Sequence, residues 1–348
     1  MKKIRIAQIG TGHDHAADIF ATLTYLSDIF EVVGYAEVPE DDISSAWAQN
    51  YYQQKREVYK DAKKYTVEEI LSMTDLDAVA VETLDLHLVK YAQMAADKGL
   101  HIHMDKAAGE STKDFEKLLS TVKSKKLVFN MGYMYRFNPM VKQAFERILR
   151  GDIGKIHSID AEMSCYYPAD KREWLGLFQG GMMQYLGCHM VDLVVRLLGA
   201  PERITQYNTA SGCEGVTAKD LALAVFQYYD ATAVVKSSML DSGGYGRRHL
   251  TVNGEKGSIT VQPFEVFVGK TDTQLFGMKS HLQVDAWSAS ESVDSEVFDR
   301  YADMCRAFAG MVRGERAMEV DLETEALVQR CLSVACGIPC EYTEEICL

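Results

Sequence analysis

The 348-residue chain alternates short apolar strands with amphipathic helices in its first third and then becomes strand-rich, which predicts an α/β fold in two parts. The first part is predicted to be a doubly wound parallel sheet, because its strands are separated by helices. The second part is predicted to be an α/β domain with a mostly antiparallel sheet. A chain of this length is long for a single core, so we expect domains at 1–131 and 132–348.

The composition excludes several classes of protein. Its 47% hydrophobic and 25% charged content is that of a globular protein. A net charge of −13 argues against nucleic acid or an anionic membrane as the main partner. No apolar stretch approaches the roughly 20 residues of a membrane helix, and the start does not resemble a signal peptide. The eight cysteines form no paired zinc motif, so we expect reduced thiols in a cytoplasmic protein.

The first strand, Ile4 to Ile9, runs into a Gly-x-Gly loop and then an amphipathic stretch over 19–29. A glycine at the first position permits the tight turn, and one at the second lets a pyrophosphate approach the backbone. In this context the pattern favours a dinucleotide site over the alternative, an ordinary strand-to-helix turn. The loop residues expected at the cofactor are Gly10, Thr11, Gly12, His13 and His15, the last standing where a third glycine is usual.

The second strand, Phe30 to Glu37, ends in an acid. A carboxylate there can hold the two ribose hydroxyls of NAD and would repel the extra phosphate of NADP. Residues 38–42 contain no lysine or arginine. We therefore predict NAD rather than NADP as the cofactor, the alternative for Glu37 being a solvated surface acid.

The rest of the first part continues the alternation. Strands are predicted at 77–81, 100–104 and 127–131, and helices at 66–73, 86–97 and 111–122. Ligands of such sheets bind at the carboxyl ends of the strands. The residues just past those ends that we expect to face a ligand are Glu82, His87, Asp105, Lys106 and Tyr133.

Lys106 is a candidate catalytic residue because it directly follows a buried strand. Its charge can lower the pKa of a substrate hydroxyl, although most lysines are simply exposed. His101 and His103 share one face of a strand and suggest a metal, but no third ligand has suitable spacing. We apply the same reasoning to His13 and His15, and predict no metal site.

The second part has strand patterns at 155–165, 222–228, 232–238, 249–252 and 258–261, and helix patterns at 140–149, 295–312 and 322–336. Gly254 and Gly257 predict a tight hairpin between the last two strands.

An apolar helix predicted over 180–199 carries the polar residues Tyr185, His189, Asp192 and Arg196 on one stripe. Buried polar groups need partners or a ligand, and Asp192 could simply pair with Arg196. His189 is a candidate general base, and Tyr185 needs a cation, such as Lys106, to share that work. The alternative is a hydrogen-bonded core histidine and a packed tyrosine.

Several motifs together resemble the glucose–fructose oxidoreductase / inositol dehydrogenase (Gfo/Idh/MocA) family. They are Gly10-x-Gly12, Asp77-Ala78-Val79 before His87, Gly99-Leu100-His101-Ile102 before Asp105-Lys106, Tyr135-Arg136-Phe137-Asn138-Pro139, Gly151-Asp152-Ile153-Gly154-Lys155-Ile156 and Gly187-x-His189-x-x-Asp192. The resemblance implies a Rossmann domain, then an α/β domain with an open, mostly antiparallel sheet that often makes a homodimer or homotetramer. It also implies NAD(P)-dependent oxidation or reduction of sugars, cyclitols or related polyols.

By position, Lys106 matches the lysine of the family's Glu-Lys-Pro motif, His189 its catalytic histidine, and Asp192 the acid three residues on. Three departures stand out. Glu-Lys-Pro is Asp105-Lys106-Ala107 here, the usual Thr-Pro is Glu82-Thr83, and the family's aspartate is Tyr185. The tyrosine could still donate and accept protons, or the chemistry could be lost.

The resemblance also places substrate contacts around Trp174, whose flat ring suits the C–H face of a sugar, although a packed tryptophan is an equally good explanation. The residues expected to bind substrate are Tyr133, Arg136, Tyr166, Arg172, Trp174 and Asp192.

The hypothesis from the sequence is an NAD-dependent dehydrogenase that acts on a secondary alcohol of a sugar, glycoside or cyclitol. His189 would accept the proton, and Tyr185 and Lys106 would bind and polarise the hydroxyl. One alternative is a glycosidase-like or isomerising enzyme that oxidises and re-reduces its substrate on a retained NAD. Another is a sensor or subunit that binds cofactor or sugar without catalysis.

Overall fold

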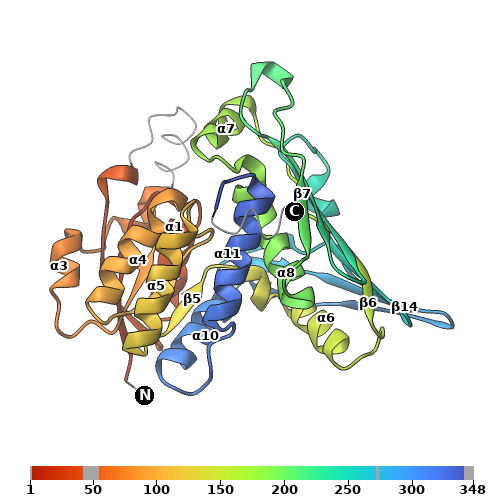
Figure 1. Ribbon diagram of the computed structural model, residues 1–348. Coiled ribbons are helices and arrows are strands. Elements are labelled where there is room, and N and C mark those ends of the chain that lie inside the picture. The colour runs from red at the N-terminus through yellow and green to blue at the C-terminus, as the bar shows by residue number, and fades with distance from the viewer. Residues whose placement is uncertain (1, 42–54, 272–273, 341–348) are drawn as a thin grey trace. The chain divides into compact units, whose positions relative to one another are not determined.

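The computed structural model describes residues 2–41, 55–271 and 274–340 (Figure 1). The chain divides into two compact units, one of residues 1–133 with 301–326 and one of residues 134–300 with 327–348. The first boundary lies two residues after the predicted one, and residues 301–326 return to the first unit, whereas the sequence analysis assigned them to the second. The reason is that helix α10 (Ala302–Val312) packs on α1 (Ala16–Tyr25), a contact between distant segments that local patterns do not reveal.

The first unit contains the predicted parallel sheet, with strand order β2-β1-β3-β4-β5. The strands are β1 (Ile4–Ile9), β2 (Phe30–Ala36), β3 (Ala78–Val81), β4 (His101–Met104) and β5 (Phe129–Met131). Because β2 lies on one side of β1 and β3 on the other, the strand order reverses at β1. The loop after β1 therefore stands at the switch point, where doubly wound sheets bind ligands.

The helices of the first unit begin where the sequence offers caps. Thr66 caps α3 and forms a capping box with Glu69, as its position predicts, and Ser111 caps α5 by accepting from the N–H of Asp114. The remaining helical segments are α3 (Val67–Leu71), α4 (Leu88–Asp97), α5 (Thr112–Lys125) and the short turns η1 (Pro39–Asp41), η2 (Arg56–Tyr59) and η3 (Asp85–His87).

The second unit is built on an eight-stranded sheet with strand order β15-β14-β11-β10-β6-β9-β8-β7. Only the β6–β9 pair is parallel, so the prediction of a mostly antiparallel sheet is confirmed. Gly254 pairs with Gly257 in the predicted hairpin. The strands are β6 (Ile156–Glu162), β7 (Arg203–Gln206), β8 (Leu221–Gln227), β9 (Thr232–Ser238), β10 (His249–Gly254), β11 (Gly257–Val261), β14 (His281–Ala286) and β15 (Ala289–Asp294).

A small second sheet corrects one predicted helix. It consists of β12 (Val266–Gly269), β13 (Gly277–Lys279) and β16 (Phe298–Asp299). The helix predicted over 295–312 was wrong at its start, since Phe298 and Asp299 pair with β13 and the helix begins only at Ala302.

The helices of the second unit include α6 and α8, which pack on the large sheet (Figure 1). The predicted helix over 180–199 is a π-helical turn, η6 (Met183–Gly187), followed by α8 (Cys188–Leu198). Among the described helices of the whole chain, none is long and apolar enough to cross a membrane. The other helical segments are α6 (Pro139–Leu149), α7 (Ala169–Trp174), η4 (Met134–Phe137), η5 (Leu175–Leu177), η7 (Cys213–Gly215), α9 (Gly244–Arg247) and α11 (Leu322–Cys336), which begins in the first unit.

Candidate functional site

The loop after β1 requires both of its glycines. Gly10 has φ of +91°, and a Cβ there would lie 2.5 Å from Cγ2 of Thr83. A Cβ on Gly12 would lie 2.4 Å from Oδ1 of Asp41. Contacts under 3 Å are closer than carbon atoms approach one another, so the first glycine lets the loop turn and the second keeps a space for an anionic group.

That space holds the carboxylate of Asp41. It accepts hydrogen bonds from the backbone N–H of Thr11 at 2.7 Å and of Leu84 at 2.9 Å. Burial raises the pKa of Asp41 to about 6, although the N–H groups of Thr11, Leu84 and Gly12 act to lower it. The converging N–H groups form an anion-binding concavity, and an internal side chain lies in it.

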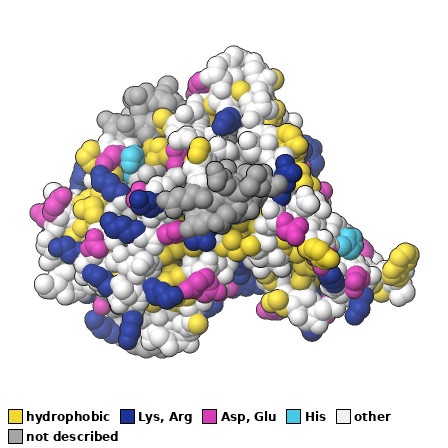
Figure 2. Space-filling view, in the orientation of Figure 1, with side chains coloured by type: hydrophobic (Ala, Val, Ile, Leu, Met, Phe, Trp, Pro, Cys, Tyr) yellow, Lys and Arg dark blue, Asp and Glu magenta, His cyan; other side chains and the backbone are white. Residues whose placement is uncertain are grey.

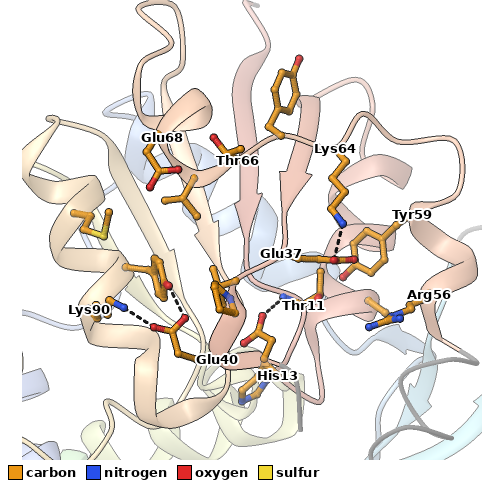
Figure 3. Close-up of a pocket in the computed structure, with 18 of the residues that line it drawn as sticks. Thr11, His13, Glu37, Glu40, Arg56, Tyr59, Lys64, Thr66, Glu68 and Lys90 are labelled. Carbon is orange, nitrogen blue, oxygen red and sulfur yellow. Dashed lines mark hydrogen bonds and ion pairs between the residues drawn. The ribbon is translucent and has the colours of Figure 1, made fainter.

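A cavity of about 1340 Å³ opens beside this loop within the first unit (Figure 3). Glu37 lies on its wall, where its carboxylate accepts from Nζ of Lys64 at 2.6 Å. Lys55, Arg56 and Lys90 also line the cavity. Thus Lys64, the cation bound to Glu37, and the other cations of this cavity lie outside the 38–42 segment on which the sequence analysis relied.

A buried polar group of side chains lies at the carboxyl ends of β1, β3 and β4. Oδ2 of Asp105 is 3.1 Å from Nδ1 of His13 and 3.1 Å from Nδ1 of His15, and Oδ1 accepts from the N–H of Lys106 at 2.7 Å. Burial opposes ionisation of Asp105, yet His13 and His15 hold the pKa of its carboxyl well below the usual range. Burial, with the charge of Asp105 beside it, raises the pKa of Glu82 well above its ordinary value. The structure thus brings five of the predicted residues together, counting Lys106.

Lys106 itself is buried, with 2% of its side chain exposed. Its Nζ is 3.9 Å from Oδ1 of Asp85, which supplies a carboxylate to this cation. His87, also predicted at the cofactor, is half-buried at the N-terminus of α4.

Two residues predicted to bind substrate neutralise each other. Arg136 donates hydrogen bonds to the carboxylate of Asp192 from two nitrogens, from Nε at 3.0 and 3.1 Å and from Nη2 at 2.6 Å. Both side chains are buried. The suggested pairing of Asp192 with Arg196 was wrong, since Arg196 lies over the ring of Phe145 at 4.9 Å. A bidentate buried pair fixes the start of the second unit to α8.

His189 lies on α8 with 2% exposure. Its ring packs edge-on against Tyr135, with centroids 4.9 Å apart. The hydroxyl of Tyr135 donates to Glu265 at 2.7 Å. Burial would raise the pKa of Glu265, but Arg300 and Arg248 lower it. The sequence analysis did not find Glu265, because nothing local marks it as the centre of a network.

Tyr185 has a cation beside it from its own unit. Nζ of Lys171 is 4.7 Å from the Tyr185 ring centroid and 3.8 Å from that of Trp174. The two rings meet edge-on, with centroids 5.6 Å apart, and Lys171 is fully buried. Sequence reasoning missed Lys171 because it stands in a run of four charged residues, which is typical of a solvated helix.

The other expected substrate residues have different surroundings. Arg172 is fully buried, with Nη1 3.0 Å from Oδ2 of Asp220 and Nε donating to the carbonyl of Tyr167 at 3.1 Å. Tyr166 is 55% exposed, and Tyr133 is buried.

The family model for the GFO/IDH/MocA C-terminal domain matches residues 141–260, the region of α6 to β11. Residues 141–260 of this chain therefore carry a C-terminal domain of the GFO/IDH/MocA type. The Rossmann-type sheet of the first unit and the mostly antiparallel sheet of the second are the two parts that this resemblance implied.

Among curated proteins, this chain is similar to the uncharacterized oxidoreductase YhhX of Escherichia coli, at 28% identity over 193 residues, 55% of this chain and 54% of the relative. It is also similar to D-xylose 1-dehydrogenase (NADP(+)) 2 of Haloferax volcanii, at 27% identity over 175 residues, 49% of this chain and 53% of that one. The chain thus matches about half the length of these curated relatives.

The fold of the whole chain is that of solved oxidoreductases. The 3-ketoreductase KijD10 of Actinomadura kijaniata, solved with TDP-benzene and NADP in an open conformation, superposes with a TM-score of 0.73 at 18% identity, over 96% of each chain.

Proposed function

We propose that the protein is an NAD(P)-dependent oxidoreductase that transfers hydride between nicotinamide and a secondary alcohol or ketone of a sugar, glycoside or cyclitol. The observation that carries this proposal is the anion-binding concavity at the loop after β1, where the backbone N–H of Thr11 in that loop and that of Leu84 after β3 converge on a carboxylate. Its position at the switch point of a parallel sheet is where dinucleotides bind. The names of the relatives, a xylose dehydrogenase and a ketoreductase, support the substrate class.

The residues of the first unit fit a dinucleotide. Gly10 would let the loop turn, and Thr11 and Gly12 would hold the diphosphate through their backbone N–H groups. The adjoining cavity of about 1340 Å³ has room for the adenosine half. The bound nicotinamide would supply the hydride acceptor or donor. Contacts from His13, His15, Glu82, His87 and Asp105 remain predictions.

NAD rather than NADP is the finer proposal. The carboxylate of Glu37 faces the cavity and suits two ribose hydroxyls, whereas a 2′-phosphate would be repelled. Lys64 partly offsets that charge, and both the xylose dehydrogenase and the ketoreductase carry NADP in their names. Titration of NADH and NADPH against wild type and Glu37→Ser decides the question. We expect NADH to bind wild type more tightly and the variant to move toward NADPH, and equal ratios in both proteins would refute the role of Glu37.

Residues of both units have proposed chemical roles. An imidazole nitrogen of His189 accepts the hydroxyl proton during oxidation, since histidine changes charge near neutral pH. Tyr185 binds the same hydroxyl, and the buried cation of Lys171 beside its ring favours the ionised phenol. Lys106 polarises the reacting oxygen through its charge. Of the predicted substrate residues, Trp174 packs with Tyr185 and is the one we propose to contact the sugar.

The experiment that tests the proposal is a panel of sugars, glycosides and cyclitols incubated with NAD or NADP, followed by absorbance of the reduced cofactor. Accumulation of NADH with one of them supports a dehydrogenase. Product formed without net NADH points to the cofactor-retaining alternative. Tight cofactor binding with neither outcome over the whole panel overturns catalysis and favours a binding protein, which the mutual neutralisation of Arg136 and Asp192 would suit.

The expected partners follow from the same proposed function. We propose a small-molecule substrate and no nucleic acid, which suits the net charge of −13 and the intermixed acidic and basic side chains on the face in Figure 2. A homodimer or homotetramer would form through the large sheet of the second unit, and light scattering tests that assembly.

A cytoplasmic location is proposed from the thiols. Burial raises the pKa of Cys165 to about 11 and that of Cys331 to about 12, so both stay protonated and unreactive, as suits a reducing compartment.

A further inference from the structure

His13, His15 and Asp105 form a compact group whose side chains face one another within the first unit. One ligand atom from each lies within 4.8 Å of the other two. The proposed hydrogen bonds to the diphosphate come from backbone N–H groups of the loop, and these three side chains, also predicted to lie at the cofactor, are not among those donors. The sequence analysis predicted no metal because no third ligand had suitable spacing, and the fold supplies that third ligand from β4.

The tautomer of His13 is fixed by its surroundings. Its Nε2 lies 2.9 Å from the carbonyl oxygen of Lys106, and a carbonyl only accepts, so Nε2 carries the hydrogen. In the neutral ring Nδ1 therefore carries a single lone pair, which accepts from the N–H of His15 at 3.1 Å. Oδ2 of Asp105, also at 3.1 Å, is an acceptor too, so the two atoms repel each other unless a proton or a cation lies between them. A histidine whose far N–H is held by a backbone carbonyl is the arrangement found around metal-bound imidazoles.

The spacing of the donor atoms suits a small divalent ion. Ligand atoms about 2.0–2.2 Å from a tetrahedral ion lie about 3.3–3.5 Å from each other. Oδ2 of Asp105 is 3.1 Å from Nδ1 of both histidines, close to that separation. The three donor atoms lie within 4.8 Å of one another, so the two imidazoles would move closer together around a bound ion. Two imidazole nitrogens and a carboxylate oxygen are donors that zinc and its neighbours in the first transition series accept.

A second buried carboxylate strengthens the case for a cation. Glu82 is fully buried, and within the described part of the chain neither of its oxygens has a hydrogen-bond partner. Nε2 of His103, likewise without a partner there, is 3.8 Å from Oε1 of Glu82. The nearby ammonium of Lys106 lies beside Asp85. The buried carboxyl of Glu82 and the buried Nε2 of His103 are polar atoms that a cation, or water bound to it, would satisfy.

We propose that His13, His15 and Asp105 bind a divalent transition-metal ion of the zinc class, with Glu82 and His103 beside it. The side chain of His15 is 13% exposed, which leaves that side of the ion open to water or a ligand. Two of the departures from the family pattern, Asp105 and Glu82, thereby become a ligand and the neighbouring acid, and His15, which stands where a third glycine is usual, becomes a second ligand.

The test uses tag-free, full-length protein treated with a chelator and then dialysed. Zn²⁺ affinity is measured by competition with a chromophoric chelator, and Co²⁺ is added separately to record its visible absorption. The variants are His15→Ala and Asp105→Asn, and His157→Ala, an exposed histidine of the second unit, is the matched control.

We expect wild type and His157→Ala to bind one Zn²⁺ per chain and to give the Co²⁺ spectrum of a nitrogen–oxygen site. His15→Ala and Asp105→Asn should each weaken Zn²⁺ binding about 100-fold or more and lose that spectrum, because each removes a direct ligand. Circular dichroism shows which variant is folded, and one folded variant is enough to test the metal site. Wild type that binds no more tightly than the two variants would overturn the site and leave a metal-free hydrogen-bonded group.

Discussion

Replacement of Asp41 by alanine should tighten dinucleotide binding. In the structure its carboxylate lies in the loop concavity that the diphosphate is proposed to enter, bound to the N–H groups of Thr11 and Leu84. The cofactor must therefore displace Asp41, and its measured affinity is reduced by the fraction of molecules in which the concavity is filled.

The magnitude follows from the hydrogen bonds that are lost. A hydrogen bond to a charged group contributes about 1.5–3 kcal/mol, and Asp41 accepts two from backbone N–H groups. Burial opposes the binding of the ionised carboxylate by these N–H groups, since it raises the pKa of the carboxyl to about 6. We therefore take the net free energy that keeps the Asp41 carboxylate in the concavity as that of about one such hydrogen bond. Its removal in Asp41→Ala corresponds to an increase in NADH affinity of about 10- to 100-fold.

The assay is NADH fluorescence titrated at several pH values. Above pH 6 Asp41 is ionised and competes with the diphosphate, whereas below it the neutral carboxyl is a weaker acceptor. The wild-type Kd should therefore fall as pH is lowered from 8 to 5.5, and the Asp41→Ala Kd should change much less. Glu40→Gln is the matched control, because Glu40 binds Lys90 and Tyr91 rather than the loop. Unchanged or weaker NADH binding by Asp41→Ala at pH 8 would refute the competition.

Four further predictions concern turnover and stability. Lys171→Met should lower kcat with little change in KM and move the alkaline limb of the pH profile upward, because the phenol of Tyr185 loses its neighbouring cation; an unmoved limb contradicts this. His189→Ala should flatten the pH dependence of kcat/KM near neutrality, and a retained profile excludes it as the base. Lys106→Ala should abolish turnover yet bind NADH normally, whereas full turnover removes its role. Asp192→Asn should cost about 3–5 kcal/mol in the urea-derived free energy of unfolding, since the buried charge of Arg136 loses its partner, and a loss under 1 kcal/mol would show that the pair matters little.

The sequence predicted those strands whose burial can be inferred from a local run of apolar residues. Buried parallel strands are short apolar runs, and Ala78–Val81 and Phe129–Met131 were found for that reason. β15, Ala289–Asp294, was not predicted, because five of its six residues are exposed and four are polar, so no alternation of buried and exposed residues marks it. α10 was placed in the wrong unit because its assignment depends on packing against α1, almost 300 residues earlier.

The candidate site likewise contains residues that a local pattern marks and residues that only the fold brings together. Gly10 and Gly12 were found from their spacing, because a tight turn is a local property of the chain. The carboxylate in that turn comes from Asp41, thirty residues beyond Thr11, and Asp105 reaches His15 across ninety residues. The burial of Lys171 depends on the rings of Trp174 and Tyr185, which no charge pattern encodes.

The claim that the β1 loop holds a dinucleotide is tested most directly by titrating NADH and NADPH into wild type and Gly12→Val, with binding followed by cofactor fluorescence. A Cβ at this position would lie 2.4 Å from an anion in the concavity, so the valine fills the space that the diphosphate needs. We expect saturable cofactor binding to wild type and a loss of affinity of about 100-fold or more in the folded variant. Equal affinity in both proteins, or no binding of either cofactor to wild type, would contradict it.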